Sequence, residues 1–155
     1  MSEQEKGFES LASYQHSLKL LKAVYKLAET LPAHEKYNLS DQIRRASISV
    51  LLNIAEGYGR YHYLDKLRFF YIARGSLAEV LSAFIVANSL GYVDNDQLDW
   101  VREVVAEAEK SLNGFITFIR KQQQGGSEYG TKYVRDDDAD YHIQLNTSEI
   151  NHPDS

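Results

Sequence analysis

The chain has 155 residues, enough for one domain with a full hydrophobic core; 43% of them are apolar and only two are proline. It contains no cysteine, which excludes disulfides, thiolate metal sites and thiol catalysis. The formal net charge is −5, from 17 basic and 22 acidic residues. Residues 125–155 hold two of the basic and seven of the acidic residues, so residues 1–124 carry 15 of each and are neutral.

The first nine residues are polar and predict a flexible N-terminus rather than a secretory signal. No continuous apolar run reaches the roughly 18 residues that a membrane-spanning helix needs. These features predict a soluble, cytoplasmic protein with no membrane contact.

Two stretches in the first part of the chain have the periodicity of helices. The first covers residues 10–31 and ends at Pro32, which cannot continue a helix. The second covers residues 39–56, and Gly57 is predicted to stop it as the glycine just past its last turn.

Two longer helices are predicted to follow. One covers residues 63–90 and closes at Gly91, and the next runs from a cap at Asp94 or Asn95 to about residue 123. The stripe predicted to face the core on the first of these is Leu67, Tyr71, Arg74, Ala78, Leu81, Ile85 and Asn88. The stripe on the second is Leu98, Val101, Val105, Ala108, Leu112, Phe115 and Ile119, in regular steps of three and four.

Short connections between long helices favour antiparallel neighbours. The sequence therefore predicts an all-α fold, an antiparallel up-down four-helix bundle over residues 10–124. After residue 124 aliphatic residues become scarce while Asp, Ser, Asn and Gly increase, which predicts a disordered acidic C-terminal tail over residues 125–155.

The second predicted helix is more apolar than a small bundle requires. Its apolar residues cover roughly two thirds of the circumference, where a stripe of about 100° is enough. Either the helix is unusually buried within one chain, or another subunit covers part of it. Its polar residues form one narrow line, which is either a solvent face or a polar seam between subunits: Gln42, Arg45, Ser49, Asn53 and Glu56.

Arg74 interrupts the predicted core stripe of the third helix. A buried arginine has to be paired, and Glu56 and Glu79 are the candidate partners. A structural ion pair that holds the second and third helices in register is favoured over a catalytic role.

The junction between these helices, NIAEGYGRYHYLDK, combines basic and aromatic residues. Residues 36–74 contain seven basic and three acidic residues, a local charge of +4. Phosphate groups bind guanidinium and ammonium groups, and unpaired bases stack on tyrosine. The alternative is that the tyrosines pack the end of the bundle. The candidate nucleic-acid or partner surface is Arg60, Tyr61, His62, Tyr63, Lys66 and Arg68.

Three motifs carry a resemblance to a known family: Q-x-R-R-A at 42–46, N-I-A-E-G-x-G-R at 53–60 and A-x-G-S-L-x-E at 73–79. Over about residues 14–121 the chain resembles a family of small bacterial four-helix-bundle proteins whose founding members are encoded in intervening sequences of large-subunit ribosomal RNA genes. These proteins are often labelled as ribosomal. The residues assigned to structural pairing or assembly are Gln42, Arg44, Arg45, Asn53, Glu56, Arg74 and Glu79.

The resemblance implies a four-helix bundle, assembly into a homopentamer and no established enzymatic activity. The chain is also similar to the accessory proteins of diversity-generating retroelements, which are pentameric bundles that bind nucleic acid and partner a reverse transcriptase. Those proteins are strongly basic, whereas residues 1–124 of this chain are neutral. The acidic tail lies outside the family pattern.

Patterns for catalysis and cofactors are missing from the sequence. The five histidines show no metal-ligand spacing, and the GYG at 57–59 is too short for a phosphate loop. The acidic run at 136–140 lacks the glycine and glutamate of a calcium loop. We therefore expect no enzyme activity, no cofactor and no metal.

These observations predict a non-enzymatic homo-oligomer, a pentamer by resemblance, that associates with RNA or DNA or acts as a scaffold. A reverse transcriptase is one candidate protein partner. The alternative is a protein–protein adaptor with no nucleic-acid role. The acidic tail either competes with nucleic acid for the basic surface or only increases solubility.

Overall fold

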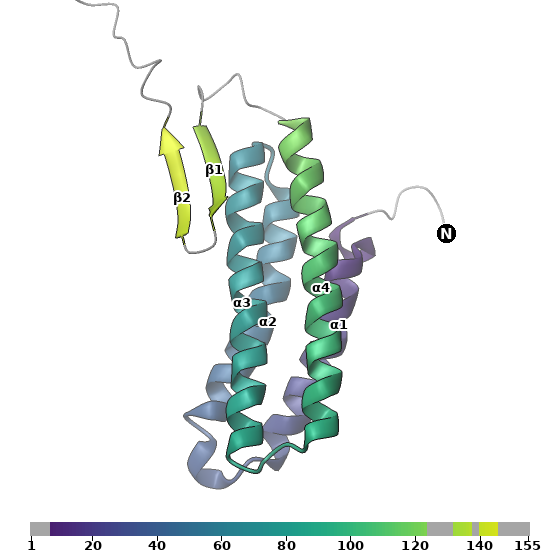
Figure 1. Ribbon diagram of the computed structural model, residues 1–155, viewed down its shortest axis with the longest axis vertical. Coiled ribbons are helices and arrows are strands. Elements are labelled where there is room, and N and C mark those ends of the chain that lie inside the picture. Colours follow the sequence, from purple (N-terminus) through teal and green to yellow (C-terminus); the bar gives the residue numbers. More distant parts are fainter. Residues whose placement is uncertain (1–6, 124–131, 138–139, 146–155) are drawn as a thin grey trace, which may run out of the picture.

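The structure, a computed structural model, describes residues 7–123, 132–137 and 140–145. Its bundle consists of four long helices (Figure 1), with one short 3-10 helix before the first and another between the first and the second. The 3-10 helices are η1 (Phe8–Ser10) and η2 (Ala33–Glu35). The four long helices are α1 (Ala12–Thr30), α2 (Leu39–Gly59), α3 (Tyr63–Ser89) and α4 (Asn95–Gln122).

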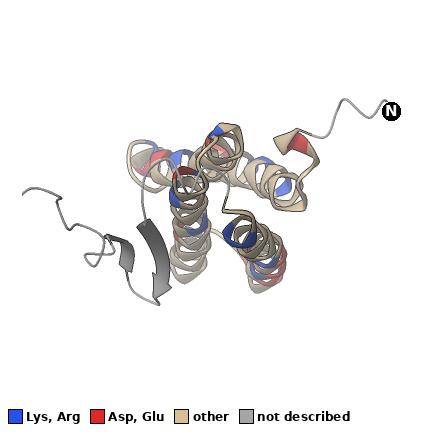
Figure 2. Ribbon diagram, turned by 90° about the horizontal axis from the view of Figure 1, so that it is seen from above, with Lys and Arg blue, Asp and Glu red and all other residues tan. Residues whose placement is uncertain are grey.

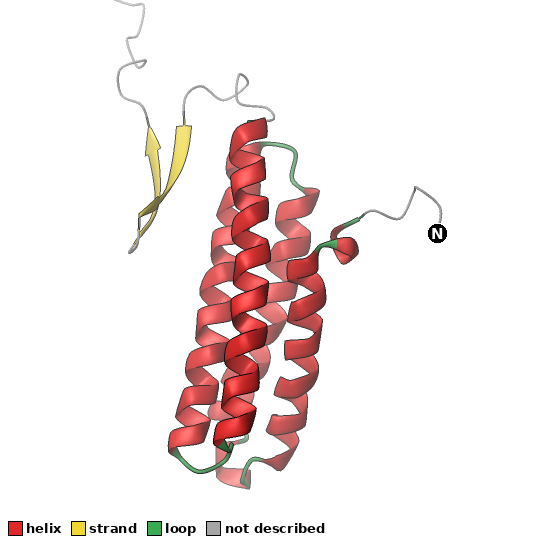
Figure 3. Ribbon diagram, turned by 45° about the vertical axis from the view of Figure 1, so that its right-hand side comes forward, coloured by secondary structure: helices red, strands yellow, loops and turns green. Residues whose placement is uncertain are grey.

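Each long helix packs against its two neighbours around the bundle, in the order α1, α2, α3, α4 and back to α1. Short loops connect helices that run alternately up and down (Figure 3). The predicted all-α, antiparallel up-down four-helix bundle is confirmed. Its largest fully buried side chains are Tyr71, Phe70, Leu20, Ile43, Ile54, Leu67, Leu77 and Leu112.

The C-terminal end of α3 and the N-terminal end of α4 are capped by the residues that the sequence predicts. Gly91 has a φ of 78°, the left-handed conformation in which glycine ends a helix without strain. Asp94 is the N-cap of α4: its carboxylate accepts from the backbone N–H of Gln97 at 2.8 Å, and the Gln97 side chain accepts from the Asp94 N–H at 3.0 Å. This reciprocal capping box satisfies two N–H groups that the first turn leaves free.

Gly57 has a different role from the predicted one. Helix α2 continues through it to Gly59, so Gly57 does not stop the helix. A Cβ atom at Gly57 would lie 2.8 Å from Cε1 of Phe70 and 3.0 Å from Cβ of Phe69. The glycine is therefore needed because α2 and α3 approach too closely here for any side chain.

The predicted core stripe of α3 is partly wrong. Leu67 and Tyr71 are buried, but Ala78 and Ile85 are exposed and Arg74 is half-buried. Apolar residues occur around most of this helix, so several stripes fit the helical period equally well. The residues that do face the core are Leu64, Leu67, Phe70, Tyr71, Ala73, Leu77, Val80, Ala83, Phe84 and Ala87.

Helix α3 also corrects the expectation that no segment could span a membrane. An 18-residue window of this helix has a mean hydropathy of 1.5, and by length and composition α3 could cross a bilayer. Within the bundle 44% of that window is buried. The core helix of a soluble protein passes the same test of length and composition, so the hydropathy of α3 alone does not indicate a membrane span.

A β-hairpin lies within the segment predicted to be disordered. Strands β1 (Lys132–Asp137) and β2 (Asp140–Leu145) pair antiparallel, with Val134 opposite Ile143. The hairpin lies beside α3, which β1 contacts (Figure 1). Isolated hairpins are marginal in water, so contact with a helix gives this one support. The rest of the predicted tail lies outside the described residues.

Candidate nucleic-acid interface

The chain reverses between α2 and α3 within three residues. Arg60 is extended, and its N–H donates to the carbonyl of Gly57 at 3.3 Å. His62 caps α3, because its Nδ1 accepts from the N–H of Leu64 at 3.2 Å. His62 is only 5% exposed, so this predicted surface residue is part of the structural junction.

Two of the predicted cations are engaged within the chain. Arg60 donates from Nε to Oε1 of Glu56 at 2.9 Å, and its guanidinium lies 5.0 Å from the ring centroid of Phe69. Lys66 donates from Nζ to the carbonyl of Tyr58 at 2.8 Å, near the C-terminal end of α2. Burial lowers the pKa of Lys66 below its usual value. A cation at this position stabilises the helix end by facing its negative dipole.

The remaining residues of the predicted surface, Tyr61, Tyr63 and Arg68, are either exposed or half-buried. Tyr61 is 57% exposed, and Arg68 is exposed on the first turns of α3. Tyr63 is half-buried, and burial raises the pKa of its phenol. Of these three residues, Arg68 and Tyr61 are therefore the ones whose side chains are accessible to a partner.

Next to this junction the structure has a cleft of about 650 Å³. Tyr63 and Lys66 line it, together with aromatic residues of α4 that the sequence analysis did not place in a site. The complete lining is Tyr58, Tyr63, Lys66, Phe115, Phe118, Ile119 and Gln122.

Aromatic rings are stacked along this cleft. Tyr58 and Phe115 have ring planes 16° apart and centroids at 6.3 Å, and Phe115 and Phe118 have planes 16° apart and centroids at 6.0 Å. Phe118 is 52% exposed, so the outer end of this series is open to solvent. A flat ring of a ligand could continue the series by stacking on Phe118.

One feature of the sequence could have predicted that Phe118 belongs to a contact site. It lies one turn after Phe115 on α4, outside the regular core series, and large apolar residues outside a core stripe are candidates for contact with a partner. Its place beside Lys66 depends on the packing of α4 against α3, which the periodicity of either helix alone does not show.

The polar line of α2 lies against α3 at its centre. The hydroxyls of Ser49 and Ser76 are 2.9 Å apart, and Asn53 donates to the carbonyl of Ser49 at 2.8 Å. Gln42, which is exposed, donates to the carboxylate of Glu79 on α3. At Gln42 and Ser49 the line therefore bonds to α3 of the same chain.

The other residues assigned to pairing are near the surface. Arg45 forms an ion pair with Asp41 at 3.4 Å, and Arg44 is half-buried. Arg45 is exposed and Arg44 half-buried, so both side chains can make further contacts. Their role in assembly stays a prediction.

Arg74 differs from its prediction. It donates from Nη1 to Oδ1 of Asn113 on α4 at 3.0 Å, and its guanidinium lies 4.9 Å from the ring centroid of Tyr71. Glu56 accepts from Arg60 and Glu79 from Gln42 instead. The side chain of Arg74 is directed toward α4, so it contacts that helix rather than α2. The side chain is half-buried.

Charges of both signs are spread over the bundle. Viewed from the junction end, the helices carry both Lys and Arg (blue) and Asp and Glu (red) (Figure 2). The part of the chain that the structure describes contains no group of three or more His, Asp or Glu placed to hold a metal ion.

Comparisons with known proteins agree with this fold. Residues 9–114 match the family described as 23S rRNA-intervening sequence protein. The chain is similar to the crystal structure of a protein of unknown function from the S23 ribosomal protein family of Bacteroides thetaiotaomicron VPI-5482, with a TM-score of 0.61 and 22% identity. This similarity covers 67% of this chain and 97% of the other, and at that identity it supports the fold alone.

No curated protein sequence matches the chain. The family match extends over more than half of the 155 residues and includes all three motifs of α2 and α3. The chain therefore belongs to the 23S rRNA-intervening sequence protein family.

Proposed function

We propose that this chain is a non-enzymatic, homo-oligomeric protein that binds single-stranded RNA at the aromatic cleft between the α2–α3 junction and α4. The observation that carries the proposal is the series of stacked rings that ends at the exposed Phe118. Aromatic side chains bind unpaired bases by stacking, and cations beside them bind the phosphates. Tyr61, in the α2–α3 junction, and Arg68, on the first turns of α3, are exposed.

Assembly is supported by apolar residues on the outside of α2 and α3. Leu52 is 63% exposed and Val86 44%, and exposed apolar residues that form a contiguous patch mark sites of contact with other chains. The exposed apolar residues of these helices are Leu52, Ile72, Ile85, Val86 and Leu90. We propose that they form the contact between copies, with five copies in the ring by resemblance to the family.

A ring would increase the attraction for a polyanion. Residues 36–74 contain seven basic and three acidic residues, so each copy has a local charge of +4. Five copies bring about +20 to the ring, enough to concentrate a polyanion at low salt. A reverse transcriptase or another protein that handles nucleic acid is a candidate partner of such a complex.

Fluorescence anisotropy with a labelled single-stranded RNA tests the proposal. Phe118→Ala should weaken binding by about 1–3 kcal/mol, the usual contribution of one stacked base. The matched control is Tyr37→Ala, which removes an aromatic side chain that is 84% exposed in the loop at the opposite end of the bundle. Equal affinities of the two variants would contradict the cleft as the RNA site.

The salt dependence separates RNA binding from the alternative, a protein–protein adaptor. Arg68→Gln should reduce the slope of log affinity against log salt by about 1, whereas Arg102→Gln, an exposed site on α4, should leave it unchanged. The adaptor alternative rests on the exposed face of α3, which would bind an apolar partner with little response to salt. Undetectable RNA binding at low salt would favour the adaptor.

A further inference from the structure

A groove separates α1 from α4 at the end of the bundle opposite the aromatic cleft. Its inner part has a volume of about 570 Å³ and its outer part about 540 Å³. Ala23, Lys26 and Trp100 line both parts, so the two are continuous. Each volume lies within the range of about 300–1,000 Å³ that is usual for sites of small ligands.

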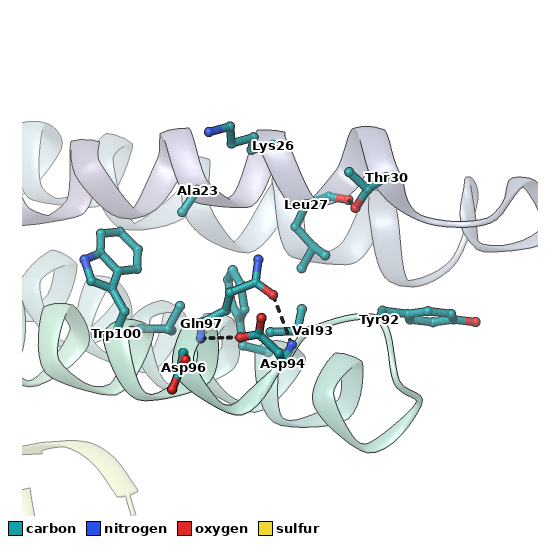
Figure 4. Close-up of a pocket in the computed structure, with 12 residues that line it drawn as sticks. Ala23, Lys26, Leu27, Thr30, Tyr92, Val93, Asp94, Asp96, Gln97 and Trp100 are labelled. Carbon is teal, nitrogen blue, oxygen red and sulfur yellow. Dashed lines mark hydrogen bonds between the residues drawn. The ribbon is translucent and has the colours of Figure 1, made fainter.

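The inner part reaches the hydrophobic core. Its floor consists of buried apolar side chains, Leu27, Phe84, Val93 and Val101. In Figure 4 the indole of Trp100 extends from α4 toward α1, and Tyr92 lies at the other end of the groove. A flat apolar group would find aromatic walls at both ends and an aliphatic floor between them.

The outer part is positively charged. Lys19, Lys22 and Lys26 lie on one face of α1 over about 10 Å of helix axis, and all three are exposed. Within residues 7–123 none of the three takes part in a hydrogen bond or ion pair. Their ammonium groups are therefore available to an anion.

One acidic residue lines the outer part and two line the inner part, so the net positive charge of the groove, three lysines against Glu29, is confined to the outer part. Glu29 is the acid that lines the outer part, where it is opposed by three lysines. In the inner part the carboxylate of Asp94 already accepts from the N–H of Gln97, and Asp96 is exposed at the first turn of α4. The cationic end and the apolar end are thus adjacent, with Trp100 between them.

From this arrangement we infer that the groove binds a small aromatic organic anion, in which a planar apolar group is joined to a carboxylate, sulfonate or phosphate. The apolar group enters the inner part beside Trp100, and the anionic group meets the lysines of α1. The site is separate from the aromatic cleft and does not depend on RNA binding.

The chain offers a direct reporter, because Trp100 is its single tryptophan. The probe is 1-anilinonaphthalene-8-sulfonate, titrated into the full-length protein while energy transfer from Trp100 to the bound probe is followed. We expect saturable binding of one probe per chain. N-phenyl-1-naphthylamine, which has the same rings without the sulfonate, should bind about tenfold more weakly, because it lacks the charge that the lysines attract.

Three sets of variants locate the probe. The triple variant Lys19→Gln, Lys22→Gln, Lys26→Gln should weaken binding of the sulfonate about tenfold and leave the uncharged probe unaffected. The matched control, Arg102→Gln, Lys110→Gln, Lys121→Gln, removes the same charge from exposed sites of α4 outside the groove and should change neither probe. Ala23→Leu should weaken both probes by filling the shared wall, and Phe118→Ala should weaken neither.

Equal losses in the two triple variants would overturn the inference, since the effect would then be one of overall charge. A failure of Ala23→Leu to weaken either probe, with the variant folded by circular dichroism, would also overturn it. If the groove variants instead change the mass of the assembly or the affinity for RNA without changing probe binding, the groove contacts a second copy or nucleic acid, and the small-anion inference is wrong.

Discussion

The phenol of Tyr92 donates a hydrogen bond to Oε1 of Glu35 at 3.4 Å, which joins the α3–α4 loop to the α1–α2 connection. The Glu35 side chain is 9% exposed. Its other oxygen accepts from the N–H of Leu39 at 3.3 Å and from Nδ2 of Asn38 at 3.2 Å. One carboxylate therefore caps the start of α2 and ties together the two loops at this end of the bundle.

Glu35→Ala should lower the free energy of unfolding by about 2–3 kcal/mol. The substitution removes the acceptor of three donors, of which the N–H of Leu39 is buried, and an unsatisfied buried donor costs about 1–3 kcal/mol. Urea denaturation followed by circular dichroism measures the loss. The control Glu29→Ala, at an exposed position on α1, should change the stability by less than about 0.5 kcal/mol. Equal effects of the two substitutions would show that Glu35 does not hold this end of the fold.

Tyr92 should make the stability fall at alkaline pH. Desolvation, followed by the charge of Glu35 and the hydrogen bond to it, raises the pKa of Tyr92 above 10.0. The folded state then keeps this proton to a higher pH than the unfolded state, so the stabilisation is complete below pH 10.0 and is lost as the pH rises through the folded pKa.

Tyr92→Phe tests this dependence. The variant should be less stable than the wild type at neutral pH, and the difference in unfolding free energy should narrow above pH 10.0. Tyr37→Phe, at a highly exposed tyrosine, should show no such narrowing. A Tyr92→Phe difference that stays constant across the alkaline range would contradict the assigned contact with Glu35.

Gly57→Ala should destabilise the chain by about 1–3 kcal/mol, the usual cost of overpacking, because the new Cβ meets the ring of Phe70. Gly114→Ala is the matched control, since a Cβ at this position of α4 has nothing within 4 Å. It should stabilise the protein by up to about 1 kcal/mol through the higher helix propensity of alanine. Thermal melts of both variants measure the effects, and a Gly57→Ala variant as stable as Gly114→Ala would show that α2 and α3 can separate there at little cost.

Leu52→Glu should break the assembly. A charge at an apolar contact between copies has to be desolvated, and an unpaired carboxylate there costs several kcal/mol. Size exclusion with light scattering should then give the mass of one chain, while Ala106→Glu, at an exposed position of α4, should keep the wild-type mass. A wild type that is monomeric at micromolar concentration would contradict the proposed oligomer itself.

The helices and their order followed from local features of the sequence. The regular series on α4, the capping residue Asp94 and the closing residue Gly91 each depend on neighbours within a few positions along the chain. Such features can be recognised without knowledge of the tertiary structure. The antiparallel arrangement then follows from the short loops.

Features that depend on packing between helices were harder to predict. Because α3 is apolar around most of its circumference, its period could not show that Arg74 faces Asn113 or that Ile85 is exposed. Gly57 has the sequence context of a helix stop, whereas its contact with Phe70 exists only in the folded bundle. Phe118 and Tyr63 line one cleft although 55 positions separate them in the chain.

The bond from Lys66 to the carbonyl of Tyr58 couples the candidate interface to the last turn of α2. A phosphate that draws the ammonium group away leaves this carbonyl to water, so polyanion binding and fraying of the helix end become thermodynamically linked. If the proposed phosphate contact forms, the linkage is reciprocal: a change that loosens residues 57–59 should raise the affinity for phosphate, and phosphate should speed amide exchange in the same three residues. Amide exchange at the end of α2 would then measure whether the neighbouring cleft is occupied.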